Sequence, residues 1–136
     1  TNYDSRKGLE LAANPAVALH FGWYPLQRQV RVEGMAAIVP RAESEAYFAT
    51  RPRGSQLGAW ASRQSSDVAS REELNAAYAE VERRFADADV PCPPHWGGYR
   101  VTPLRYEFWT HDDARLHHRV VYRRDGGGWV RELLSP

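Results

Sequence analysis

Five segments with strand character, placed near the two ends of the chain, constrain its fold more than any other feature. They are 16–23, 29–39, 104–109, 119–124 and 129–133. In the second of them, Val30 and Val32 alternate with Arg31 and Glu33, which is the two-residue period of a strand. The first is short and apolar, which indicates a buried strand. The sequence Asp125–Gly127 predicts a turn that joins the last two as a hairpin.

Four further segments have helical character: 5–13, 43–49, 55–62 and 71–86. The last is the clearest, because Ser70 is a good N-cap and Glu73 stands where a capping box needs an acid. Its apolar residues fall on one helical face: Leu74, Ala77, Tyr78, Val81 and Phe85. Strands toward both ends with helices between them predict a mainly β fold, an antiparallel barrel decorated by helices.

The length, charge and cysteine count exclude several classes of protein. The 136 residues suffice for one domain with a single core. A net charge of +1 gives no field that would steer the chain to nucleic acid or to an anionic membrane. No apolar run reaches the ~18 residues of a membrane span, and no segment resembles a signal peptide. The single cysteine, Cys92, excludes an intrachain disulfide and a cysteine-based zinc site. We therefore expect a soluble, cytoplasmic protein.

The segment Ser5-Arg6-Lys7-Gly8 is a candidate phosphate site. Adjacent cations at the start of a helix add their charge to the free N–H groups and the helix dipole. Basic pairs of this kind are also common on solvated surfaces, so the segment alone does not establish a phosphate site.

A second candidate lies around the expected helix 43–49. Tyr47 and Arg51 are four residues apart and share a face if the helix extends that far. With Ser55 they offer two hydroxyls and a guanidinium to one anion, although a helix end with a capping serine is an equal alternative. Gln29 and the pair Gln64-Ser65 can both donate and accept hydrogen bonds, which suits a polar ligand as well as a plain loop.

The segment Glu107 to Arg119 carries the strongest signal. Arg115, His117 and Arg119 alternate along an expected strand, so they should project to one face. Two guanidinium groups and an imidazole on one face would repel each other without an anionic guest. Metal binding is the competing interpretation, because several ligand types are present: His111, Asp112, Asp113, His117 and His118. The flanking arginines argue against a divalent cation, so we expect no metal site.

Six stretches, in this order, resemble the pyridoxine 5′-phosphate oxidases: TNYDSRKG, RQVRVEG, YFATRPRGSQLGAWAS with RQSS, PPHWGGYRV, EFW and RLHHR. The resemblance runs from Thr1 to Pro136. It implies an FMN-binding split β-barrel that works as a homodimer, with FMN at the subunit interface. The chain would then be a single domain, 1–136, whose residues from about 92 to 136 form a dimerisation and substrate-binding region.

The implied activity is the oxidation of pyridoxine or pyridoxamine 5′-phosphate to pyridoxal 5′-phosphate. In this family a hydride passes to the flavin, which O₂ reoxidises with release of H₂O₂. Two rival interpretations stay open. One is a flavin oxidase of secondary metabolism, such as a phenazine-pathway enzyme. The other is a non-catalytic protein of the same fold that binds FMN or pyridoxal phosphate.

The resemblance also assigns roles to individual residues. The FMN contacts it implies are Thr1, Arg6, Lys7, Gln29, Gln64, Ser65, Trp109 and Arg119. The substrate-phosphate pocket it implies consists of Tyr47, Arg51 and Ser55. Arg115 and His117 match the pair that lies over the substrate ring, and we expect them to be the catalytic residues. Arg115 would orient the substrate, since a guanidinium stays charged, and His117 would assist the substrate hydroxyl or amine.

Three features depart from the family pattern. His118 stands where the family usually has an acid, and Thr110-His111 replaces the usual Gln-Gly. An upstream strand pair, with an arginine and a lysine that help to hold FMN and substrate, is missing. The chain also does not begin with Met. We therefore expect the barrel to be incomplete at its N-terminus in this chain.

Overall fold

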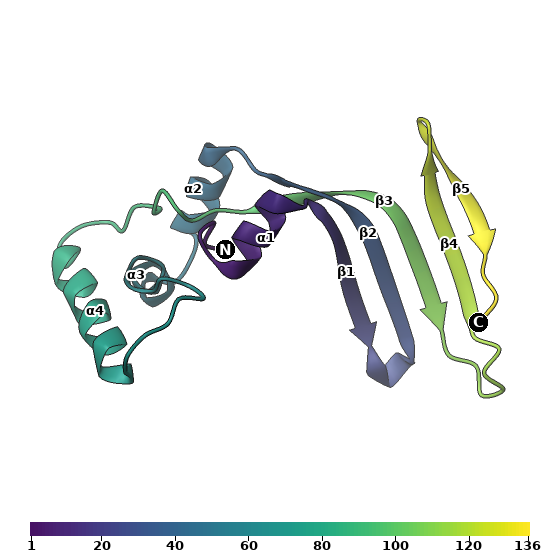
Figure 1. Ribbon diagram of the computed structural model, residues 1–136, viewed down its shortest axis with the longest axis horizontal. Coiled ribbons are helices and arrows are strands. Elements are labelled where there is room, and N and C mark those ends of the chain that lie inside the picture. Colours follow the sequence, from purple (N-terminus) through teal and green to yellow (C-terminus); the bar gives the residue numbers. More distant parts are fainter. The chain divides into compact units, whose positions relative to one another are not determined.

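The computed structural model describes all residues from 1 to 136 and has a strand or helix in each of the nine segments named above as strands or helices (Figure 1). The strands are β1 Ala16–Trp23, β2 Arg28–Ile38, β3 Tyr99–Thr110, β4 His118–Asp125 and β5 Gly128–Leu133. The helices are α1 Arg6–Ala13, α2 Arg41–Ala49, α3 Arg53–Ala61 and α4 Arg71–Arg84, with one 3-10 turn, η1 Tyr24–Leu26. None of these helices has the length and apolar content that a membrane crossing requires.

The chain forms two compact units, each built from two stretches of sequence. The helical unit consists of residues 1–14 and 38–100 and contains α1 to α4. The sheet unit consists of residues 15–37 and 101–136.

The sheet is antiparallel and its five strands follow chain order, from β1 to β5. In the β3–β4 pair, Trp109 lies opposite Arg119 and Glu107 opposite Val121, so these side chains share one face of the sheet. The β4–β5 hairpin turns through Gly126, whose φ of +55° suits a residue without a Cβ.

Strand β1 is not buried, which corrects the expectation for 16–23. Of its eight residues only Val17 is partly covered, and the other seven are exposed. The physical reason is its place in the sheet: β1 pairs with β2 alone and ends the strand order. Apolar composition identified the strand, but composition does not show whether anything packs on it.

The core of the helical unit lies between α2, α3 and α4. Phe48, Leu57, Phe85 and Val90 are buried there, and Tyr78 and Val81 of α4 pack against them as the helical periodicity predicted. The N-cap of α4 also forms as expected, because Ser70 Oγ accepts a hydrogen bond from the Glu73 backbone N–H at 3.1 Å. The Glu73 carboxylate accepts from the Ala69 N–H at 3.0 Å, one residue before the usual capping-box partner.

Candidate functional site

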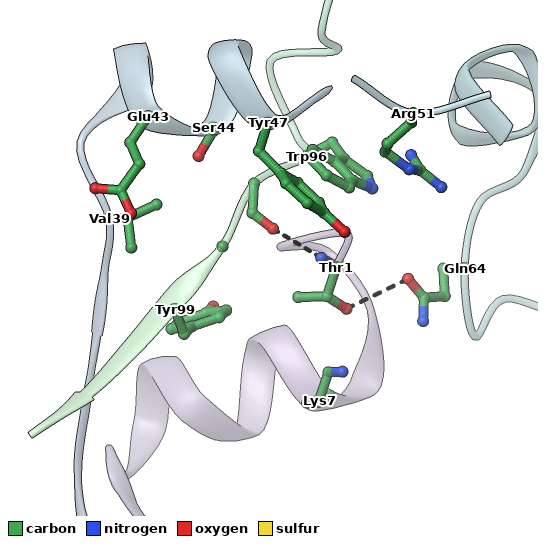
Figure 2. A pocket seen from close by; sticks show the side chains of 12 residues that line it. Thr1, Lys7, Val39, Glu43, Ser44, Tyr47, Arg51, Gln64, Trp96 and Tyr99 are labelled. Atoms are coloured by element: carbon green, nitrogen blue, oxygen red, sulfur yellow. Dashed lines mark hydrogen bonds between the residues drawn. The ribbon is translucent and has the colours of Figure 1, made fainter. Parts of the chain in front are cut away.

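A cavity of about 530 Å³ in the helical unit collects several of the residues singled out from the sequence (Figure 2). Its volume is within the range of small-molecule sites. Cations, hydroxyls, an amide and aromatic rings line it: Thr1, Lys7, Val39, Glu43, Ser44, Tyr47, Arg51, Gln64, Trp96, Gly97, Gly98 and Tyr99. Figure 2 shows Lys7, Gln64 and Arg51 arranged around one part of this cavity, near Thr1.

Arg51 is held on an aromatic platform. Its guanidinium carbon lies 4.7 Å from the centre of the Trp96 ring and 5.5 Å from that of Phe48. Tyr47 stacks on the same Trp96 ring, with centroids 6.2 Å apart and planes within 7°. Tyr47 and Arg51 therefore reach one cavity although α2 ends at Ala49, because both pack on the indole.

One nitrogen of Arg51 is without an acceptor. Its Nη1 is buried and makes no hydrogen bond. Leaving a buried donor of a charged group unpaired costs about 1–3 kcal/mol or more, and such atoms in native proteins call for an explanation. A ligand with anionic oxygens would supply the missing acceptor.

A second cavity of about 320 Å³ shares Arg51, Gln64 and Trp96 with the first. It also contains Ser55, so Tyr47 and Ser55 line two different cavities that share the Arg51 side chain. The Gln64 Oε1 accepts from the Asn2 backbone N–H at 3.1 Å and from Thr1 Oγ1 at 3.4 Å. This leaves the amide NH₂ of Gln64 as a donor for a ligand.

Trp96 is the functional residue that the sequence reasoning missed. The carbonyls of its loop are held by Arg41, which donates to the backbone oxygens of Cys92, Pro93 and Trp96 at 2.5–3.2 Å. Gly97 follows, where a Cβ would lie 2.0 Å from the Tyr3 hydroxyl. A tryptophan between a proline-rich loop and two glycines was visible in the sequence, but only the fold shows what stacks on it.

Two of the implied FMN contacts in the helical unit, Arg6 and Ser65, do not line this cavity. Arg6 lies on an exposed part of α1 and pairs with Glu10 at 2.8 Å. Ser65 is exposed in the loop after α3 with φ of +69°. The start of α1 is also already capped, since Ser5 Oγ accepts from the Gly8 N–H at 3.2 Å. Anion binding here would therefore rest mainly on the side chain of Lys7.

In the sheet unit, the expected strand face of Arg115, His117 and Arg119 does not exist, and that prediction is wrong. Strand β4 begins at His118, and Arg115 lies in the preceding loop with φ of +63°. The physical reason is a turn at Asp112, whose carbonyl accepts from the Arg115 N–H at 3.0 Å. Aspartate favours such turns because its side chain bonds nearby backbone groups.

For Arg119, the argument that the cation needs an anionic ligand also fails, because Glu107 supplies the anion. Glu107 is only 2% exposed, and its Oε1 accepts from Arg119 Nε at 2.8 Å. Its Oε2 accepts from Arg105 Nη2 at 3.0 Å, and Arg31 lies 3.9 Å away. Arg119 donates in addition to the Ser135 carbonyl at 3.0 Å. Arg119 Nη2 also lies 2.8 Å from Glu107 Oε1, so oxygens of the chain itself engage both ends of this guanidinium.

Gln29 and Trp109 meet at another cavity of about 290 Å³ in the sheet unit. Its other lining residues are His20, Gly22, Tyr24, Gln27, Arg28 and His111. Gln29 Oε1 lies 2.7 Å from His20 Nε2, which holds the amide in place. The His117 ring packs on Trp109 with centroids 4.7 Å apart. An aromatic wall beside a fixed amide suits a flat heterocyclic ligand.

The Glu107 cluster makes stability depend on pH. Hydrogen bonds from Arg119 and then Arg105 outweigh the opposing effect of burial, so the pKa of Glu107 lies below its ordinary value of 4.5. A lowered folded-state pKa stabilises the fold at pH above 4.5. That contribution is lost as the pH falls through the folded-state pKa.

We therefore expect the free energy of unfolding to fall when the pH is lowered from about 6 to about 3. Urea denaturation across this range measures it, and Glu107→Gln should show a shallower decline than the parent protein. Equal slopes for the two proteins would show that Glu107 does not contribute to the acid sensitivity.

Comparison with known proteins places these features in context. Residues 1–85 match the family model described as pyridoxamine 5′-phosphate oxidase. Residues 96–136 match the model described as the pyridoxine 5′-phosphate oxidase C-terminal dimerisation region. The whole chain is 61% identical to a pyridoxine/pyridoxamine 5′-phosphate oxidase from Rubrobacter xylanophilus and 60% identical to one from a Nocardioides species. It spans 63% of the length of each of these relatives.

Solved structures with the same fold agree with this. The crystal structure of PhzG from Burkholderia lata, in complex with tetrahydrophenazine-1-carboxylic acid, has a TM-score of 0.92 and 32% identity. The match covers 100% of this chain and 66% of that one. A pyridoxamine 5′-phosphate oxidase-related, FMN-binding protein from Nostoc punctiforme has a TM-score of 0.68 at 13% identity, which shows the fold alone. The match covers 100% of this chain and 71% of that one. The expected fold class, a split β-barrel with helices, is confirmed, and the part in this chain is an open antiparallel sheet.

Proposed function

The chain belongs to the pyridoxamine 5′-phosphate oxidase family, and from that premise we propose that it forms part of an FMN-dependent oxidase of phosphorylated vitamin B6 compounds. The reaction converts pyridoxine or pyridoxamine 5′-phosphate to pyridoxal 5′-phosphate. For the alcohol substrate, the carbon gives up a hydride and its hydroxyl gives up a proton, and O₂ takes these two electrons and two protons to become H₂O₂. For the amine substrate, water is also consumed and ammonia is released.

The unpaired Nη1 of Arg51 carries this proposal. A phosphate dianion can accept two parallel hydrogen bonds from one guanidinium, and such charge-assisted pairs are about twice as strong as neutral ones. Tyr47 and Ser55 line the two cavities that share Arg51, and their hydroxyls can donate to the remaining oxygens. Free phosphorylated pyridines are small enough for these cavities.

FMN is the cofactor of this family, and the residues present fit it. Lys7 provides a cation and Gln64 an unused amide NH₂ in the helical unit. In the sheet unit, Trp109 and Gln29 offer an aromatic surface and a fixed amide. FMN, when bound, supplies the two-electron redox chemistry that amino-acid side chains lack.

The chain's own residues bind and orient the substrate. Arg51 holds the phosphate, and Arg115, always charged, presents a cation from an exposed loop. The half-buried ring of His117 is fixed against Trp109. We propose that Arg115 and His117 orient the substrate ring and its reacting substituent, which is the role that the family resemblance implies for them.

A homodimer and a cytoplasmic location belong to the same proposal. The match of residues 96–136 to a dimerisation region supports the dimer. Large apolar side chains of the sheet unit are exposed, among them Phe21 and Trp23 at 47% and Phe108 and Trp129 at 43%. Exposed apolar surface of this kind is typical of protein interfaces. Sedimentation of the intact protein measures the oligomeric state.

A phenazine-type oxidase is the second candidate, favoured by the structural similarity to PhzG. The identity of 32% to that protein is lower than the 61% to the Rubrobacter relative. A carboxylated phenazine precursor carries no phosphate, so Tyr47, Arg51 and Ser55 would have no phosphate group to bind.

The proposal is tested with the intact purified protein. Flavin absorbance after reconstitution shows whether FMN binds, and addition of pyridoxamine 5′-phosphate in air should release H₂O₂ and pyridoxal 5′-phosphate in equal amounts. Unphosphorylated pyridoxamine is the control and should react poorly. Flavin binding without peroxide release would instead identify a non-catalytic binder, and turnover of a tetrahydrophenazine carboxylate alone would identify the rival oxidase.

A further inference from the structure

The loop between β3 and β4 folds around Asp112. The Asp112 carboxylate accepts from the Ala114 N–H at 2.9 Å, and its carbonyl accepts from the Arg115 N–H at 3.0 Å. Its own backbone N–H donates to His117 Nδ1 at 3.2 Å. One residue thus shapes the turn and also contacts the imidazole that the proposed function places beside the substrate.

We propose that Asp112 is a positioning residue that keeps the proton of the neutral His117 imidazole on Nε2. His117 then acts as a hydrogen-bond donor to the substrate and not as the base that takes the substrate's proton. The tautomer follows from the loop geometry alone, whereas the donor role rests on the proposed function.

The hydrogen bond determines the tautomer. A neutral imidazole has one N–H donor and one acceptor nitrogen, and the partner of one nitrogen decides the state of the other. Since the Asp112 N–H can only donate, His117 Nδ1 must accept. The proton is therefore on Nε2, and no group of the chain hydrogen-bonds to that nitrogen.

The surroundings of the ring do not favour a general base. A histidine base usually has a carboxylate or carbonyl at the opposite nitrogen, which stabilises the imidazolium that forms. His117 has a donor there instead, and an imidazolium Nδ1–H would face the Asp112 N–H. The other neighbours are Trp109 and His111, with ring centroids at 4.7 and 5.3 Å. The nearby Asp113 carboxylate is engaged by His111 Nε2 at 3.2 Å.

Nitrogen-15 NMR of histidine-labelled, FMN-reconstituted protein tests the tautomer without turnover. The two ring nitrogens and their carbon-bound protons give correlation patterns that differ between the Nε2–H, Nδ1–H and imidazolium forms, and the His117 signals are those lost in His117→Gln. We expect the Nε2–H pattern at neutral pH. It should persist in Asp112→Asn, whose amide oxygen keeps the turn, and give way to a tautomer mixture in Asp112→Ala. An Nδ1–H or imidazolium pattern in the parent protein would overturn the proposal.

Kinetics test the donor role. Glutamine can place an amide N–H near the position of Nε2, whereas asparagine is too short. A donor role predicts that His117→Gln loses about 10-fold in kcat/KM and His117→Asn and His117→Ala about 100-fold. The acid limb of the pH profile should be the same in His117→Gln as in the parent protein. Equal losses of about 100-fold or more in all three variants, with the acid limb abolished, would establish a base. If the parent protein turned over neither phosphorylated substrate, the proposed function would fail while the NMR result still decided the tautomer.

Discussion

Replacing Glu107 by alanine is expected to destabilise the intact protein by about 3 kcal/mol, which lowers its melting temperature by roughly 10 °C. Removal of one partner from a buried ion pair leaves the other charge uncompensated. Here Arg119 and Arg105 both donate to the Glu107 carboxylate, and Arg31 lies 3.9 Å from it. The loss is smaller than for a fully buried cluster, because these arginines are partly exposed. Urea denaturation and thermal unfolding measure it.

Glu33→Ala is the matched control. Glu33 also pairs with Arg105, at 2.7 Å, but its side chain is 43% exposed, so its removal should cost under about 1 kcal/mol. Similar losses in both variants would contradict the importance of burial.

We further expect Glu107→Ala to weaken FMN binding, since Arg119 would lose the contact that fixes its orientation. Flavin fluorescence titration at a temperature where both proteins are folded separates this effect from unfolding.

Arg51→Ala should raise the KM for pyridoxamine 5′-phosphate by roughly 100- to 1000-fold, while the protein's stability changes little. The affinity falls because two charge-assisted hydrogen bonds to the phosphate are lost. The stability is nearly preserved because the variant loses the cation–π contacts with Trp96 and Phe48 but also removes a buried, unpaired Nη1. Steady-state kinetics and thermal unfolding measure the two effects.

Arg51→Lys should recover only a small part of the affinity, since lysine is a point charge and cannot donate in a bidentate fork. Arg83→Ala is the control, because that arginine is exposed on α4 and pairs only with the neighbouring Glu80. An unchanged KM in Arg51→Ala, or an equal loss with unphosphorylated pyridoxamine, would remove Arg51 from the phosphate site.

The local elements were predictable because their signals lie within a few residues of each other. The Ser70 cap, the apolar face of α4 and the alternation of Val30 and Val32 each depend on neighbouring residues, and each is confirmed. The turn at Asp112 was missed although its signal is also local. Two adjacent aspartates favour a turn, but the alternation of cations after them was interpreted as a strand.

The contacts that make the site depend on residues distant in sequence. Arg51 and Trp96 are 45 positions apart, yet the Arg51 guanidinium packs on the Trp96 ring. The Arg41 side chain holds the loop that carries Trp96, across 51 to 55 positions. No periodicity relates such residues, because they meet only when α2 packs beside that loop.

The sequence by itself determined the elements, their order and the residue types available for a phosphate and a flavin, because propensity, capping and turn chemistry act over a few residues. The tertiary structure alone decided which charges are paired. Glu107 neutralises Arg119, for which the sequence had suggested an anionic ligand. Arg51 has the one buried guanidinium nitrogen without a hydrogen-bond partner. Pairing depends on distance and burial in three dimensions, and only the fold brings Glu107 to Arg119 and leaves Arg51 for a ligand.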